Sequence, residues 1–151
     1  MALIMFTKMV IEGKGIDVYS YGKMKRDFTY IDDIAEAIIY LQDMIPQANI
    51  KWTGETRIAV TSSALYRVYN ISHSSFVELM DYITALEKAL GTTAEKNMFP
   101  FHSGDVLEAS ADAKALYNVI GIKPLSSIKD GIKNFVDWYK HFMNFDRIVY
   151  N

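Results

Sequence analysis

The sequence comprises 151 residues, half of them hydrophobic, which fits one globular domain and excludes a wholly disordered chain. Its 16 basic and 18 acidic side chains give no electrostatic footprint for nucleic acid, and it has no cysteine for a disulfide, a thiol nucleophile or a thiolate zinc site. No apolar run reaches the ~18 residues of a membrane span, and the first residues do not form a signal peptide. We therefore expect a cytoplasmic protein without a nucleic-acid or membrane partner.

The first part of the chain predicts a helix followed by a strand. Leu3, Phe6 and Val10 fall on one helical face, which predicts a helix over 2–12. Residues 16–21 then alternate between apolar and polar side chains, as in a strand.

A second helix and a long loop are predicted next. The helix has an apolar stripe at the i, i+4, i+7 and i+11 positions, and Asp32 or Asp33 can cap it, while Pro46 ends it. The stripe consists of Ile34, Ile38, Leu41 and Ile45. No period is visible over about 46–65, and a loop of this length tends to be functional or disordered. Residues 66–71 are rich in aromatic and β-branched side chains and predict a second strand.

A third helix is predicted by a capping box and a following apolar face. Ser75 and Glu78 can satisfy each other's backbone N–H groups, and Gly91 provides the stop. The apolar face consists of Leu79, Ile83, Leu86 and Leu90. Residues 96–99 predict a short strand before a proline.

The last part of the chain predicts a turn and two more helices. The turn lies at 102–105, Asp112 can cap a short helix that ends near Gly121, and residues 127–130 open the final helix. The mixed order of elements predicts an α/β fold in one compact unit over 1–151. Strands so few and so far apart cannot pair locally into a stable sheet, which suggests that they belong to a larger one.

Two motifs that could carry redox chemistry are misplaced. Tyr19 with Lys23, and Tyr21 with Lys25, match Y-x-x-x-K, but both tyrosines begin in the predicted strand, so the paired side chains would not share a helical face. Gly13-Lys14-Gly15 is the only G-x-G, and a dinucleotide loop needs a strand before it and a helix after it. The predicted order is the reverse, so we interpret this tripeptide as a turn.

A cluster of three cations is the feature best suited to bind an anion. Lys23, Lys25 and Arg26 could hold a phosphate, Arg26 through two parallel N–H groups, although a solvated basic turn is an open alternative. No metal site is predicted, because the histidines have no second ligand at metal spacing. These histidines are His73, His102 and His141.

The same segment carries a family resemblance. Arg26-Asp27-Phe28-Thr29-Tyr30-Ile31-Asp32-Asp33 resembles the R-D-F-x-Y-V-D-D signature of extended short-chain dehydrogenase/reductases that act on nucleotide sugars. Further short motifs follow in the family's order and spacing, at 13–19, 69–71, 104–106, 110–112 and 121–124. Phe135-Val136-Asp137-Trp138-Tyr139 and the insert at 45–48 resemble the UDP-glucuronate 4-epimerase branch. The resemblance covers essentially the whole chain, whereas family members are a little over twice as long.

The resemblance implies the fold and the missing chemistry. It implies an extended Rossmann-type nucleotide-sugar epimerase, an NAD-dependent isomerase, of which this chain is the C-terminal substrate-binding part. The N-terminal dinucleotide-binding unit, with the glycine-rich NAD loop and the catalytic tyrosine and lysine, is lacking. We therefore expect no catalytic, cofactor-binding or metal-binding residue in this chain, and NAD only in the full-length enzyme.

The resemblance also implies roles for five residues. Arg26 matches the arginine that binds the nucleotide's phosphates, the backbone at Val18 and Tyr19 matches the strand beside the uracil, and Asp105 matches the acidic residue near the uridine ribose. His102 occupies the position of an arginine in the same turn. A neutral imidazole has one N–H donor where a guanidinium has five, which weakens this phosphate contact.

The leading hypothesis is a UDP-sugar-binding portion of a nucleotide-sugar epimerase of polysaccharide biosynthesis, inactive by itself. Two alternatives stay open: a non-catalytic oligomerising or weakly UDP-binding module from a truncated gene, and an intact enzyme of another class. Because the predicted strands at 16–21 and 66–71 would lack sheet neighbours, we also expect self-association.

Overall fold

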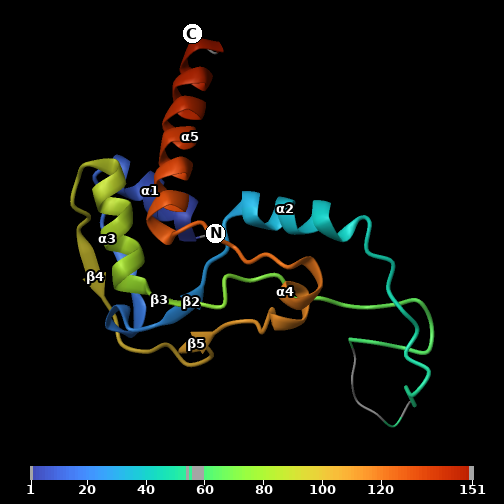
Figure 1. Ribbon diagram of the computed structural model, residues 1–151. Coiled ribbons are helices and arrows are strands. Elements are labelled where there is room, and N and C mark those ends of the chain that lie inside the picture. The colour runs from blue at the N-terminus through green and yellow to red at the C-terminus, as the bar shows by residue number, and fades with distance from the viewer. Residues whose placement is uncertain (1, 54, 56–59, 150–151) are drawn as a thin grey trace. The chain divides into compact units, whose positions relative to one another are not determined.

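The computed structural model describes residues 2–53, 55 and 60–149, and the chain forms two compact units (Figure 1). Unit 1 comprises Met1–Phe28, Ser75–Ala109 and Ser126–Asn151. Unit 2 comprises Thr29–Ser74 and Ser110–Leu125. The grouping of all residues into a single domain stays a prediction.

Three helices surround the core of unit 1. They are α1 (Ala2–Ile11), α3 (Leu79–Leu90) and α5 (Ile128–Val149). Figure 1 shows α3 and α5 side by side, and the two helices are in contact. The buried cluster consists of Phe6, Val10, Ile16, Val18, Tyr82, Ile83, Leu86, Ala94, Ile132 and Val136. The apolar stripes predicted for α1 and α3 therefore correspond to the faces that pack in this cluster.

A two-stranded parallel sheet lies beside these helices. β1 (Ile16–Val18) pairs with β4 (Lys96–Met98), and Ile16 lies opposite Lys96. Ile16 and Val18 are completely buried while Asp17 between them is exposed, as the alternation of side chains along a strand requires. The short strand predicted at 96–99 is thus confirmed.

The strand predicted over 16–21 is wrong in its second half. β1 ends at Val18, and the chain enters a tight turn, η1 (Tyr19–Gly22), in which Ser20, Tyr21 and Gly22 have φ values of 54°, 51° and 76°. Alternation alone cannot detect this, because left-handed backbone is set by neighbouring segments. Here the amide of Tyr21 donates to the carbonyl of Phe99 at 3.0 Å, which holds the turn against the residue after β4.

A three-stranded sheet completes unit 1. β2 (Lys25–Asp27) is its central strand, antiparallel to β3 (Phe76–Glu78) and parallel to β5 (Glu108–Ala109). The capping box predicted at 75–78 is therefore wrong, since these residues are mostly strand. Pairing with β2 satisfies their backbone groups, and the amide of Leu79 donates to the carbonyl of Met24 at 2.8 Å.

Unit 2 contains two helices, α2 (Ile31–Leu41) and α4 (Lys114–Ile120), which contact each other. α2 begins one residue before Asp32, so Asp32 and Asp33 lie in its first turn instead of capping it. Their charges still favour the helix N-terminus. α2 also ends well before Pro46, and of its described side chains only Ala37 is buried.

α4 has the boundaries that its sequence predicts. The carboxylate of Asp112 accepts the amide of Lys114 at 2.9 Å, and Gly121 ends the helix with a φ of 74°. Leu116 of this helix is completely buried.

The strand predicted at 66–71 is wrong. Among the described residues a single bridge forms there, between Arg67 and Thr61, and the amide of Val68 donates to the carbonyl of Val60 at 3.0 Å. A two-stranded ribbon of this length is marginal without further strands, so the segment is otherwise irregular. The described part of the loop predicted at 46–65 is likewise irregular, and its residues 54 and 56–59 lie outside the described residues.

Candidate functional site

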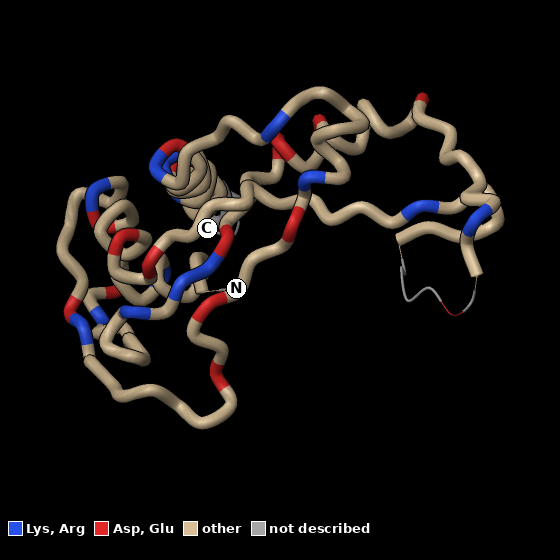
Figure 2. Tube along the Cα trace, turned by 60° about the horizontal axis from the view of Figure 1, so that its bottom comes forward, with Lys and Arg blue, Asp and Glu red and all other residues tan. Residues whose placement is uncertain are grey.

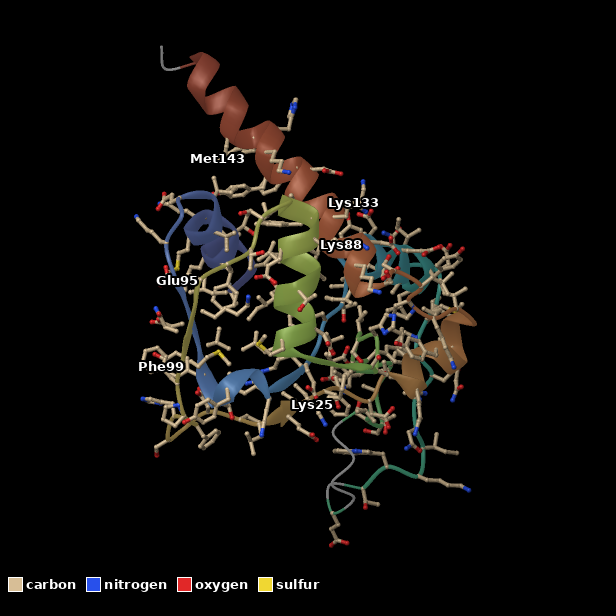
Figure 3. The ribbon with its side chains drawn as sticks, turned by 90° about the vertical axis from the view of Figure 1, so that its left-hand side faces the viewer. Lys25, Lys88, Glu95, Phe99, Lys133 and Met143 are labelled. Carbon is tan, nitrogen blue, oxygen red and sulfur yellow. The ribbon has the colours of Figure 1, made fainter. Side chains whose placement is uncertain are left out.

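The residues that the sequence marks for ligand binding all lie in unit 1. They come from β1 and η1, from β2, and from the segment that joins β4 to β5. Figure 3 shows Phe99 and Lys25 toward the end of unit 1 where α3 begins. Segments about eighty residues apart in the sequence thus meet through the parallel pairs β1 with β4 and β2 with β5.

Arg26 is the central cation of this site. It lies in the middle of β2 and is half-buried, with Val77 and Ala109 as its partners on the two neighbouring strands. Its Nη1 donates to the carbonyl of Lys25 at 2.8 Å and to the carbonyl of Leu107 at 3.3 Å. Within the described part of the chain, Arg26 forms no ion pair with a carboxylate. Its positive charge is therefore oriented by neutral carbonyl groups and not neutralised by an acid.

The other two cations of the cluster differ from Arg26. Lys25 Nζ lies 3.0 Å from the carboxylate of Glu108 on β5, and this hydrogen bond, together with the charge of Glu108, raises the pKa of Lys25. Lys23 is exposed at the end of η1. Lys25 is thus paired across the sheet, which leaves Arg26 as the better candidate for an anionic ligand.

An aromatic cluster forms the second part of the site. The rings of Tyr19 and Phe99 stack with centroids 5.3 Å apart, and the ring of His102 meets Tyr19 edge-on at 6.1 Å. Tyr19 is 37% exposed, so one side of this cluster is open to a ligand. Val18 lies below it in the core, and its carbonyl accepts the amide of Phe99 at 2.9 Å.

The turn predicted at 102–105 is confirmed. The amide of Asp105 donates to the carbonyl of His102 at 3.0 Å, and Gly104 adopts a φ of 103°. Asp105 and His102 are both exposed. The structure thus brings the ring of His102 to Tyr19, and it brings the carbonyl of Leu107, two residues after the turn, to Arg26. Asp105 lies in the exposed turn between His102 and Leu107.

The motifs that the sequence analysis set aside have other structural roles. The aromatic ring of Tyr19 contacts Phe99, and the ammonium of Lys25 contacts Glu108, so the Y-x-x-x-K matches span η1 and β2 and not an α-helix. Gly13-Lys14-Gly15 follows α1 and precedes β1, which is the reverse of a dinucleotide-binding loop. These residues therefore do not fit the pyrophosphate of NAD.

Neither a metal centre nor a membrane span can be built from the described side chains. Across residues 2–53, 55 and 60–149, no three His, Asp or Glu side chains gather closely enough to hold a metal ion. No helix in the same part of the chain has the length and hydrophobicity to cross a membrane.

Sequence reasoning missed two contributors to the site, Phe99 and the carbonyl of Leu107. Phe99 has a local signal, since it is an exposed aromatic residue at the end of a predicted strand and before a predicted turn. Leu107 has none, because its role depends on the backbone carbonyl that β2 and β5 bring to Arg26.

Comparison with known proteins found a matching family model and relatives of similar sequence. The family model described as "NAD dependent epimerase/dehydratase family" matches residues 2–51, which include β1, η1, β2 and α2. An uncharacterized 37.6 kDa protein of Escherichia coli O111:H- is 68% identical over 142 residues, which are 94% of this chain and 42% of that protein. The chain is thus similar in sequence to proteins of the NAD-dependent epimerase/dehydratase family, and the family model itself matches its first third. It spans about two fifths of the length of the relatives that it matches.

Two further similar proteins are named as nucleotide-sugar enzymes. A probable UDP-glucuronate 4-epimerase of Rhizobium meliloti (strain 1021) is 39% identical, over 92% of this chain and 41% of that protein. The crystal structure of UDP-glucuronic acid 4-epimerase from Bacillus cereus, in complex with UDP-glucuronic acid and NAD, matches with a TM-score of 0.72 and 24% identity, over 94% of this chain and 40% of that one. The predicted α/β, Rossmann-type epimerase fold is thus confirmed for a partial portion of the family structure.

Proposed function

We propose that this chain is the C-terminal, UDP-sugar-binding portion of a nucleotide-sugar epimerase similar to the UDP-glucuronate 4-epimerases, and that it is inactive by itself. The match to the epimerase family model and the names of the relatives support the reaction class. In full-length enzymes the resemblance implies that NAD supplies the oxidation and re-reduction at C4 of the sugar. The role of the present residues is to bind and orient the nucleotide.

The observation that carries this proposal is the environment of Arg26. A half-buried guanidinium with only neutral partners among the described residues favours a ligand that brings its own negative charge. The diphosphate of UDP is such a ligand, and the nearby Tyr19 and Phe99 stack offers an aromatic surface for a base. Asp105 and His102 would then lie on the ribose and phosphate side.

Titration of the chain with UDP in a calorimeter tests the binding role. Arg26→Ala should weaken UDP binding about tenfold to a hundredfold, since a charge-assisted hydrogen bond contributes roughly 1.5–3 kcal/mol. Arg26→Lys keeps the charge but loses the parallel N–H pair, so its affinity for UDP should lie between those of the wild type and Arg26→Ala. Lys23→Ala is the matched control from the same segment and should change affinity by less than about threefold.

Two outcomes would contradict the binding role. One is the absence of saturable binding at millimolar UDP, and the other is an Arg26→Ala variant that is folded and binds UDP as tightly as the wild type. The proposal that the chain is inactive by itself has its own test. We expect neither stoichiometric NAD binding nor interconversion of UDP-glucuronate and UDP-galacturonate by the chain alone. Measurable turnover would show that the reaction centre does not need a dinucleotide-binding unit.

A further inference from the structure

Unit 2 contains a polar hollow that has no part in the proposed nucleotide site. Its volume is about 430 Å3, within the range of small-ligand pockets, and it lies between α4 and the segments on either side of it. The polar side chains that line it are Ser74, Ser110, Asp112, Lys114, Asn118 and Lys123. Every one of these residues belongs to unit 2, whereas Arg26 belongs to unit 1.

The walls of the hollow are joined by hydrogen bonds between distant segments. The hydroxyls of Ser72 and Ser74 donate to the carbonyl of Ala111 at 2.8 Å and 3.4 Å. The amide group of Asn70 donates to the carbonyl of Asp112 at 3.3 Å, and the hydroxyl of Tyr117 donates to the carbonyl of Ser72. The segment 70–74 is therefore fixed against the start of α4, and the hollow is formed before any ligand arrives.

The charges around the hollow are unbalanced. Lys114 and Lys123 form no ion pair with any carboxylate in the described part of the chain. The single acid, Asp112, directs one carboxylate oxygen to the amide of Lys114 at 2.9 Å and so serves the start of α4. The ammonium of Lys123 lies 6.0 Å from the centre of the Tyr117 ring, and the hydrogen bond of that ring to Ser72 fixes its position.

We propose that this hollow binds a phosphate group, either as free phosphate or as a small phosphomonoester. Two lysines beside the Ser110 hydroxyl and the Asn118 amide offer positive charge and hydrogen-bond donors on several sides, which suits the oxygens of a phosphate group. Two lysines against the single carboxylate of Asp112 leave the lining with a net positive charge, which favours an anion. The hollow is a second anion site, whose occupation does not depend on UDP binding at Arg26.

Phosphate titration of the 15N-labelled chain at low ionic strength tests this site. Saturable shifts should appear in the backbone amides of Ser74, Ser110 and Asn118. Lys114→Ala and Lys123→Ala should each weaken phosphate binding about tenfold, the effect of losing one charge-assisted contact. Lys123→Arg keeps the charge and should retain most of the affinity. Low ionic strength is needed, because exposed charges are screened by salt.

Matched variants separate this site from other cations. Lys51→Ala removes an exposed lysine of unit 2 outside the hollow and should change affinity less than twofold. Arg26→Ala should leave these shifts unchanged even if it abolishes UDP binding, so failure of one site does not imply failure of the other. Thermal melts verify that each variant is folded.

Three outcomes would overturn the proposal. They are the absence of saturable shifts at millimolar phosphate, equal loss of affinity in Lys51→Ala and Lys123→Ala, and acetate binding as tight as phosphate binding. Comparison of inorganic phosphate with glycerol 2-phosphate identifies the source of the group. Tighter binding of the ester would favour a phosphomonoester, and weaker binding would favour free phosphate.

Discussion

At the scale of single residues, Gly22 fixes the turn between the aromatic cluster and Arg26. Its φ is +76°, and a Cβ added there would lie 2.2 Å from Cγ and 2.6 Å from Sδ of Met80 on α3. Gly22→Ala should therefore lower the free energy of unfolding by about 1–3 kcal/mol, since it combines overpacking with a left-handed backbone. Urea denaturation monitored by circular dichroism measures this loss.

Gly13 provides the control for Gly22. It also has a positive φ, +67°, but a Cβ added there would meet nothing within 4 Å. Gly13→Ala should thus cost only the backbone term of about 1 kcal/mol. Met80→Ala should recover part of the loss in a Gly22→Ala background, because it removes the clashing atoms. Equal losses at both glycines would refute the close approach to Met80.

The ion pair of Glu87 and Lys96 is the second residue-scale feature. Both side chains are mostly buried, the Lys96 Nζ to Glu87 Oε1 distance is 2.5 Å, and the amide of Ala94 donates to the same oxygen at 2.8 Å. Burial raises the pKa of Glu87, but the hydrogen bonds from Lys96 and Ala94 and the charge of Lys96 outweigh it and lower that pKa below its usual value. The pair joins α3 to β4.

This lowered pKa predicts a stability that depends on pH. Because the carboxylate is favoured in the folded state, its contribution is present above the unfolded pKa of about 4.3 and disappears as the pH falls through the folded value. Glu87→Gln should lose roughly 1–3 kcal/mol of unfolding free energy at pH 7. The difference from the wild type should shrink when both are unfolded in urea near pH 3. A constant difference between these two pH values would contradict the assignment.

At the scale of elements, α5 begins with a cap that the sequence predicts. The Ser127 hydroxyl donates to the Asp130 carboxylate at 2.6 Å and accepts the amide of Asp130 at 3.2 Å. Ser127→Ala should destabilise the chain by about 1 kcal/mol, whereas Ser127→Asp should retain most of the stability. Thermal melts monitored by circular dichroism measure both, and Ser103→Ala in the exposed turn is the control. Indistinguishable melting temperatures for Ser127→Ala and Ser103→Ala would exclude this role.

Helices were predicted better than strands, for a physical reason. The stripes of α1 and α3 are local, so Phe6, Ile83 and Leu86 mark the buried faces without knowledge of any partner. Strands depend on distant partners, which explains why 66–71 is mostly irregular and 76–78 is a strand. The candidate site shows the same difference between local signals and contacts with distant segments. Arg26 was identified from its own chemistry, whereas the carbonyl of Leu107 beside it follows only from the pairing of β2 with β5.

At the scale of the whole molecule, charge gives little reason for nonspecific binding. Figure 2 shows Lys and Arg interspersed with Asp and Glu along the described trace. Apolar exposure is more notable. In α2, Ile31 is 63% exposed, Ile38 is 49% exposed and Ile39 is 62% exposed. In unit 1, β1 has β4 as its single strand partner within the described residues, so one edge of this sheet is open.

These exposed groups predict that the chain self-associates. Exposed apolar side chains and unpaired strand edges both favour pairing with another chain, and burial of an isoleucine contributes roughly 1.5–3 kcal/mol. Sedimentation velocity over a range of concentrations should show a mass above that of the monomer. Ile39→Lys places a charge on the exposed face of α2 and should shift the equilibrium toward the monomer at least tenfold. Ile50→Lys, at an exposed isoleucine outside the helix, should have little effect. A clean monomer at high concentration would contradict self-association, and association unchanged in Ile39→Lys would assign it to the open edge of β1 instead of α2.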